Sequence, residues 1–118
     1  QIQMKTNKTL LIIDDEVDVC TLLRRSFRGE FKTVEAAYLL NDALSLAERI
    51  HPDILLLDNN LPDGQGIDFI QRFKSINPFM RIVVISAMDL HSEAIAAGAN
   101  AFLGKPLKME AIREAICA

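Results

Sequence analysis

The chain has 118 residues, half of them apolar, and a formal net charge of −3. This length suits one globular domain with a single core. No apolar run approaches the roughly 20 residues of a membrane span, no signal-peptide pattern opens the chain, and the charge gives no reason to bind nucleic acid. We therefore expect one cytoplasmic domain over 1–118 that binds neither membranes nor nucleic acid, with 1–7 frayed.

The first predicted strand covers 8–13 and leads to an acidic pair, Asp14 and Asp15. A helix over 16–28 follows, because apolar residues recur at helical spacing from Val19 through Leu22 and Leu23 to Phe27. Other positions of this helix carry Arg24, Arg25 and Arg28. We interpret these arginines as a solvated helix face. After the helix, 31–36 alternates apolar and polar residues, as an edge strand does.

A second helix is predicted over 40–49, before His51-Pro52. The stretch 54–58 then carries four apolar residues straight to Asp58, followed by a loop rich in Asn, Pro, Asp and Gly. Such a run reads as a strand buried on both faces, typical of parallel sheets covered by helices. Ligands in these sheets gather at the carboxyl ends of the strands. Asp58 is therefore placed for chemistry, unless it only caps a turn.

A third helix is spaced by Ile67, Ile70 and Phe73 and ends around 74–76. A fourth strand over 82–85 delivers Ser86, and a short helix over 89–97 follows. The fifth strand, 101–103, leads to Lys105. A last helix buries Met109, Ile112 and Ile116.

Five strands that alternate with five helices predict an α/β fold with a doubly wound parallel sheet. Right-handed crossovers and the strand order 2-1-3-4-5 give a flavodoxin-like arrangement. In this order, helices one and five cover one face of the sheet, and helices two to four cover the other.

The predicted strand ends carry Asp14, Asp15, Asp58, Ser86 and Lys105. In a parallel sheet these side chains project at one rim. Neighbouring carboxylates repel by roughly 4 kcal/mol per pair at 4 Å with an effective dielectric near 20, so a positive charge must sit among them. Carboxylates, a carbonyl oxygen and several waters suit Mg²⁺, which leaves room for a phosphate oxygen.

Such a rim suits the transfer of a phosphoryl group to a carboxylate. Phosphoryl transfer requires an aligned nucleophile and counter-charges for the transferred oxygens. Asp58 would be the nucleophile and would form an aspartyl phosphate. The cation and Lys105 would offset charge in the transition state, while the Ser86 hydroxyl would hold one phosphoryl oxygen.

This ordered set of motifs resembles the receiver domain of two-component response regulators. The matching residues are Asp14-Asp15-Glu16, Asp58 with Pro62 and Gly66 four and eight residues on, Ser86-Ala87, and Lys105-Pro106. Each motif alone is a weak signal, but the ordered set on strand ends is specific. The resemblance covers the chain from about Lys8 to Ile116.

The resemblance implies that Asp58 accepts phosphate from a phosphohistidine on a sensor histidine kinase or a histidine phosphotransfer protein, with acetyl phosphate as a substitute donor. The domain would then be a phosphoacceptor that assists its own phosphorylation and dephosphorylation, not an enzyme. Asp15, Asp58 and the backbone carbonyl of Asn60 would bind Mg²⁺ directly, with Asp14 acting mostly through water. The family also implies a cis peptide bond between Lys105 and Pro106.

The same resemblance implies a switch. Ser86 would move toward the phosphoryl group, and Phe102 would turn inward behind it. The surface around the fourth helix, fifth strand and fifth helix would change, and partners would dock there. Asn60 and Met88, two residues after Asp58 and Ser86, would tune the loss of phosphate.

One spacing departs from the family pattern. Ser86 and Lys105 are 19 residues apart, about three fewer than the family leads us to expect and close to one helical turn. We therefore predict that the fourth helix is short or irregular.

Three other functions remain open. A magnesium-dependent phosphatase with an aspartate nucleophile needs a second acid two residues later, where Asn60 stands after Asp58. A nucleotide-binding protein needs a glycine-rich phosphate loop after the first strand, where Asp14 and Asp15 would repel phosphate. A receiver-like scaffold that never takes phosphate is the third.

Two cysteines, Cys20 and Cys117, are too few for a disulfide framework or a zinc site. The predicted helices that carry them lie on the same face of the sheet. Because disulfides are rare inside cells, we expect two thiols that are buried or half-buried.

Overall fold

The computed structural model describes residues 6–118. The prediction of a frayed start at 1–7 falls largely on residues outside this range. Within the described part, the backbone N–H of Thr6 donates to the carbonyl of Glu30 at 2.8 Å. Whether 1–118 is one self-contained domain stays a prediction.

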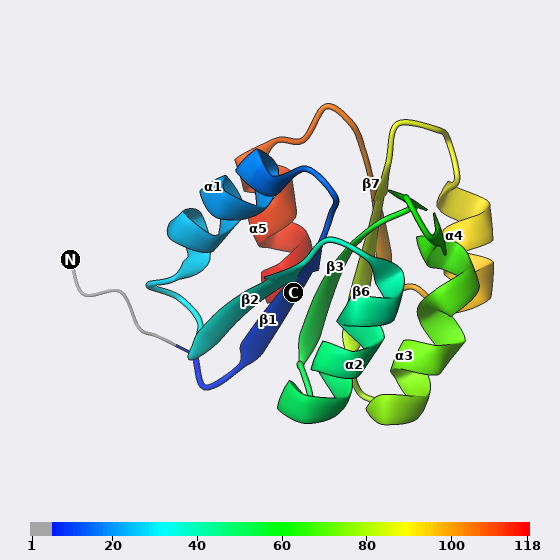
Figure 1. Cartoon of the computed structure of the whole chain (residues 1–118). Helices are drawn as coiled ribbons and strands as arrows, with labels where there is room; N and C mark the ends of the chain where they lie inside the picture. The colour runs from blue at the N-terminus through cyan, green and yellow to red at the C-terminus, as the bar shows by residue number, and fades with distance from the viewer. Residues whose placement is uncertain (1–5) are drawn as a thin grey trace.

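Five parallel strands form the central sheet, in the order β2-β1-β3-β6-β7 (Figure 1). They are β1 (Thr9–Ile13), β2 (Thr33–Ala37), β3 (Ile54–Asp58), β6 (Arg81–Ser86) and β7 (Ala101–Gly104). The predicted α/β fold and strand order are therefore confirmed. A short antiparallel hairpin, β4 (Asn60–Leu61) with β5 (Gly64–Gln65), follows β3 and was not predicted.

Helices cover both faces of the sheet, as predicted (Figure 1). On one face lie α1 (Val17–Phe27) and α5 (Met109–Cys117). On the other lie α2 (Leu40–Ile50), the 3₁₀ helix η1 (Gly66–Phe69), α3 (Ile70–Ile76) and α4 (His91–Ala97).

The core has two layers because successive residues of a strand point to opposite faces. In β1, Leu10 and Ile12 pack into the layer under α1 and α5, while Leu11 and Ile13 pack into the layer under α2, α3 and α4. Every residue of β3 is buried, including Asp58 at its end. The apolar run 54–57 thus anchors a carboxylate at a fixed position.

Several boundaries and buried positions differ from the prediction. Leu22 of α1 is exposed, and Cys20 takes the inward position with Leu23 and Phe27. Strand β2 begins at Thr33 and not at 31, because Phe31 precedes the strand and packs its buried ring edge-on against Phe27. The third helix begins as a 3₁₀ turn, η1.

Helix α4 spans seven residues, about two turns, and is followed by the C-cap residue Gly98, which has a left-handed φ of 114°. The prediction of a short fourth helix is confirmed. Both cysteines are free, as expected, although Cys117 is exposed and only Cys20 is buried. None of the helices in the described part of the chain is long and apolar enough to cross a bilayer.

Candidate functional site

The sheet register brings the predicted reactive residues to one rim. Strand β1 pairs Ile13 with Leu57, so the next residues, Asp14 and Asp58, leave neighbouring strands side by side. Strand β6 pairs with β3 on the far side, and its last residue, Ser86, pairs with Gly104 of β7. We call the group Asp14, Asp15, Asp58, Ser86 and Lys105 the strand-end site.

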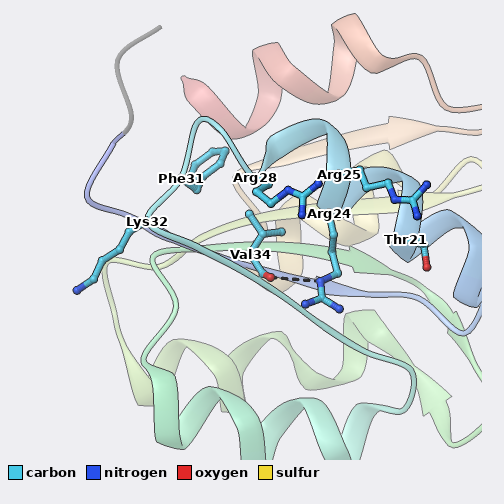
Figure 2. A pocket seen from close by; sticks show the side chains of 7 residues that line it. All are labelled: Thr21, Arg24, Arg25, Arg28, Phe31, Lys32 and Val34. Carbon is cyan, nitrogen blue, oxygen red and sulfur yellow. Dashed lines mark hydrogen bonds between the residues drawn. The ribbon is translucent and has the colours of Figure 1, made fainter.

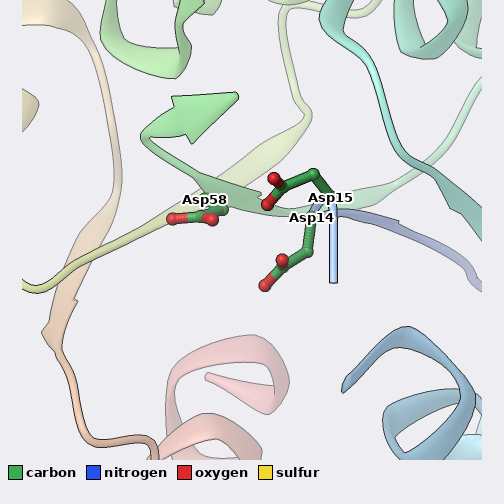
Figure 3. A group of neighbouring side chains, drawn as sticks. All are labelled: Asp14, Asp15 and Asp58. Carbon is green, nitrogen blue, oxygen red and sulfur yellow. The ribbon is translucent and has the colours of Figure 1, made fainter. Parts of the chain in front are cut away.

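Three carboxylates of the strand-end site converge. Asp14, Asp15 and Asp58 each offer one oxygen, and these oxygens lie within 4.8 Å of one another. Figure 3 shows the three side chains grouped at the ends of their strands. Asp14 and Asp58 are each only 3% exposed, whereas Asp15 is exposed.

Lys105 brings a cation to this acidic group from the end of β7. Its Nζ lies 3.5 Å from Oδ2 of Asp58 and 3.9 Å from Oε1 of Glu16. Its backbone N–H donates to the carbonyl of Ser86 at 3.0 Å, which holds the loop after β7 against the end of β6. The peptide bond between Lys105 and Pro106 is cis, as the resemblance implied.

The electrostatics of the site follow from burial. The pKa of Asp58 is raised to about 6, first by burial and second by the negative charge of Asp14, and Lys105 only partly offsets this rise. Burial also raises the pKa of Asp14, although a hydrogen bond from the backbone of Glu16 and the charge of Lys105 lower it. The positive charge of Lys105 therefore does not fully offset the cost of ionising both buried carboxylates.

These residues suit a hard divalent cation. Among the described residues, Oδ1 of Asp58 is a buried side-chain oxygen without a hydrogen-bond partner. Buried carboxylate oxygens need such a partner or a cation. Three carboxylates within reach of one point form the oxygen-rich set that Mg²⁺ or Ca²⁺ prefers.

Ser86 is fully buried, and its Oγ accepts a hydrogen bond from the backbone N–H of Met88 at 3.1 Å. The hydroxyl proton of Ser86 thus stays available for another acceptor. Met88 itself is 60% exposed. Phe102 is half-buried, and its ring lies 5.8 Å from that of His91 at the start of α4.

The loop after Asp58 is fixed by Asn59, which the sequence analysis did not single out, and by Gly66. Asn59 is buried, donates its N–H to the carbonyl of Ile85, and accepts the N–H of Ile67 on its side-chain Oδ1. Gly66 lies so close to the strand that a Cβ atom would come within 2.8 Å of the carbonyl of Asp58. The family motif had pointed to Gly66 but gave no role for it.

Asp63 was also missed. Its two carboxylate oxygens accept the backbone N–H groups of Leu40 and Asn41, at 2.8 and 3.0 Å. Helix α2 has no side-chain cap of its own, and Asp63 supplies one from the hairpin loop. These hydrogen bonds lower the pKa of the Asp63 carboxyl. The only sequence signal was a helix start at Leu40 without a nearby Ser, Thr, Asp or Asn before it.

The structure thus brings together Asp14, Asp15, Asp58 and Lys105, and Ser86 ends the strand that pairs with that of Asp58. Asn60 and Met88 follow Asp58 and Ser86 by two residues, and Phe102 lies in β7. Asn60 is exposed at the start of the hairpin. The chemical roles of these residues stay predictions.

Comparison with known proteins gives the family. The family model for the response regulator receiver domain matches residues 10–117. Sporulation initiation phosphotransferase F of Bacillus subtilis is 32% identical over 93% of this chain and 91% of that protein. Chemotaxis protein CheY of Thermotoga maritima is 31% identical over 92% of this chain and 94% of its own length.

Longer proteins match as well. The transcriptional regulatory protein ZraR of Salmonella typhimurium is 32% identical, but the chain spans only 25% of it. A crystal structure of a response regulator from Burkholderia pseudomallei, with a phosphorylated aspartic acid and a calcium ion, superposes with a TM-score of 0.84 at 28% identity, over 93% of this chain and 66% of that one. The chain therefore belongs to the response regulator receiver domain family, the phosphoacceptor signalling domains of two-component systems.

Proposed function

We propose that Asp58 is the phosphoacceptor of this receiver domain and that its donor is a phosphohistidine on a sensor histidine kinase or a histidine phosphotransfer protein. The observation that carries this proposal is the convergence of Lys105, 3.5 Å away, and two further carboxylates on one buried aspartate. A purely structural carboxylate would not be buried at a strand end with one oxygen unpaired.

In the proposed reaction, an oxygen of the Asp58 carboxylate attacks phosphorus while the bond from phosphorus to the donor imidazole nitrogen breaks. The imidazole leaves with the electron pair of that bond and takes up a proton. Lys105 stabilises the charge on the transferred oxygens, because its ammonium already lies beside Asp58. Ser86 donates its hydroxyl proton to one phosphoryl oxygen.

Mg²⁺ is the proposed cofactor. Asp15, Asp58 and the backbone carbonyl of Asn60 would hold it directly, with Asp14 acting mostly through water. When bound, the cation supplies positive charge that offsets the repulsion among carboxylates and phosphoryl oxygens. The protein contributes the fixed carboxylate geometry and the loop that Asn59 and Gly66 hold against β3.

The proposed output is a change of surface. Ser86 gives up the N–H of Met88 as it turns toward the phosphoryl group, and Phe102 leaves the ring of His91 as it turns inward. The surface of α4, β7 and α5 is altered as a result, and downstream partners dock there. Asn60 and Met88 flank the path of attacking water and set the rate at which phosphate is lost. The phosphate can shift this equilibrium only by its preference for one of the two states.

The test is phosphorylation by acetyl phosphate with Mg²⁺, followed by intact mass. The wild-type protein is expected to gain one phosphoryl group and the Asp58→Asn protein none. The Asp68→Asn protein, altered at an exposed carboxylate, is the matched control and is expected to behave as wild type. The assignment would be refuted if the Asp58→Asn protein gained a phosphoryl group, or if none of the three proteins gained one.

A further inference from the structure

A surface cavity lies away from the strand-end site, between α1 and the edge strand β2. Figure 2 shows the seven residues that line it, Thr21, Arg24, Arg25, Arg28, Phe31, Lys32 and Val34. Its volume is about 380 Å³. We call this cavity the basic groove.

The basic groove lies at the opposite end of the sheet from Asp58. Arg24 and Arg28 belong to the last turn of α1 and the residue after it, and Lys32 precedes the first residue of β2. Asp58 is the last residue of its strand. The basic groove is therefore separate from the proposed phosphorylation chemistry.

Four of the seven lining residues are cations, and none is a carboxylate. Within the described residues, none of the four forms an ion pair. The two glutamates nearest to these cations in the sequence, Glu30 and Glu35, do not neutralise them. Glu30 is bound by Arg113 of α5, and Glu35 points to the α2 face of β2, because Val34 and Ala36 occupy the α1 face. The sequence 1–5 contains no acidic residue either.

Two other surface cavities provide a comparison. The cavity beside the strand-end site includes Asp14 and Glu16 together with Lys105. The cavity between β2 and α2 includes Asp42 together with Arg49. Both therefore contain charges of both signs. The basic groove differs because its charges are all positive, although the chain as a whole is negative.

Arg24 is held in place at the side of the basic groove. Its Nε donates to the carbonyl of Val34 at 3.3 Å, on the open edge of the sheet (Figure 2). A guanidinium has five N–H donors, so the two terminal nitrogens of Arg24 remain free for a ligand. Figure 2 shows Arg28 on the same side of Val34 as Arg24, Arg25 beside Thr21, and the flexible side chain of Lys32 extending away from the arginines at the outer end.

From this geometry we propose that the basic groove binds the oligophosphate group of a small molecule, one that carries at least two linked phosphates. Guanidinium groups match phosphate oxygens in paired hydrogen bonds. A cavity of about 380 Å³ is within the range of small-molecule sites, which begins at about 300 Å³. The cations are exposed and screened by solvent, so each contributes little alone, and only a ligand with several charges engages them together.

The test uses inorganic triphosphate, ATP and inorganic phosphate as probes, with the full chain in EDTA so that no divalent cation loads the strand-end site. Binding is followed by calorimetry and by backbone amide shifts. Both triphosphate and ATP are expected to bind and to shift amides within 21–34. Inorganic phosphate is expected to bind more weakly than either. If inorganic triphosphate and ATP bind with equal affinity, the groove recognises the phosphates alone. If ATP binds more tightly, the groove also contacts the nucleoside.

The key variant is Arg25→Gln with Arg28→Gln, which leaves the hydrogen bond of Arg24 intact. We expect it to lose about tenfold in triphosphate affinity, as two charge-assisted contacts are removed. The matched control is Arg49→Gln with Arg72→Gln, two exposed arginines outside the basic groove with the same loss of charge. It is expected to retain wild-type affinity. Both variants should still accept phosphate from acetyl phosphate.

The proposal would be overturned if triphosphate did not bind, or if inorganic phosphate bound as tightly as triphosphate. It would also be overturned if the two double variants lost equal affinity for triphosphate. Amide shifts centred on residues 14–15 and 58–61 would likewise contradict it, because they would place binding at the strand-end site. A poly-glutamate peptide that binds more tightly than triphosphate would assign the basic groove to an acidic protein partner instead.

Discussion

The strand-end site and the basic groove each gather at least three like charges, but they differ in burial. Asp14 and Asp58 are each 3% exposed, and their pKa values are raised. Arg25 and Arg28 are exposed and keep their contact with water. Charges of one sign are therefore costly in the strand-end site and nearly free in the basic groove.

This difference separates two kinds of binding. The strand-end site is built around the buried carboxylate of Asp58, the nucleophile in the proposed reaction, so one cation or one phosphoryl group is expected to have a large effect there. The basic groove spreads its charge over flexible side chains, so only a ligand with several charges gains from it. Four variants test this contrast, in order of decreasing expected effect.

The largest expected effect is that of Lys105→Gln on phosphorylation. Because Lys105 is the cation that lies beside Asp58, its loss is expected to slow phosphorylation by acetyl phosphate by about 10²-fold to 10³-fold. A time course of intact mass with Mg²⁺ measures the rate. Lys108→Gln, an exposed lysine three residues later, serves as the control and should leave the rate unchanged. Similar rates in the two variants would contradict the role of Lys105.

The second substitution tests the cost of burying the Asp58 charge. The pKa of the folded carboxyl, about 6, exceeds the ordinary value of 3.8, so the unfolded chain loses its proton first as pH rises. Stability is therefore lost between about pH 4 and pH 6, by at most about 3 kcal/mol. Without divalent cations at pH 7.5, the Asp58→Asn protein is expected to be more stable than wild type, and the gain should vanish below pH 4.

Urea unfolding at several pH values in EDTA measures this gain, and Asp89→Asn, at an exposed carboxylate, is the control. Added Mg²⁺ should narrow the difference, because it stabilises only the protein that binds it. A gain that does not depend on pH would show that burial of the charge is not its cause.

The third substitution tests how closely the loop after Asp58 is packed. In the Gly66→Ala protein, the new Cβ would meet the carbonyl of Asp58 and Cγ of Leu57, each at 2.8 Å. Overpacking of this kind costs about 1 to 3 kcal/mol. Gly104→Ala is the matched control, since its Cβ would have no neighbour within 4 Å. Chemical denaturation compares the two, and equal stabilities would mean that the loop is free to move.

The smallest effect is expected in the basic groove. The double variant Arg25→Gln with Arg28→Gln alters exposed side chains that form no ion pair within the described residues. Its free energy of unfolding should stay within about 0.5 kcal/mol of wild type. Thermal unfolding at low salt measures this. A larger loss would show that these arginines stabilise the fold, for example through the helix dipole at the end of α1.

The sequence predicted the sheet well because its strands are short apolar runs with few alternatives. The run 54–57 can be satisfied only by burial on both faces, and this places Asp58 at the rim. The short α4 was predicted because the spacing of Ser86 and Lys105 is shorter than the family resemblance leads us to expect. The predicted start of β2 was wrong because Phe31 packs into the core from a loop. Alternation of apolar and polar residues cannot distinguish a buried loop residue from a strand residue.

The contacts around the strand-end site were harder to predict because they join distant segments. Asp63 caps α2 from 23 residues away, and no local pattern announces such a cap. The hairpin of β4 and β5 has only two residues in each strand, which is too short to give a periodic signal. The arginines of α1 read as a solvated face until the structure placed the edge of β2 beside them.

The sequence by itself determined the family, the order of the strands and the identity of the residues at their ends, because these depend on local apolar runs and on motif order. Only the tertiary structure decided which charges are buried. Burial depends on what neighbouring strands and helices place around a side chain, and it distinguishes the raised pKa of Asp58 from the solvated arginines of the basic groove.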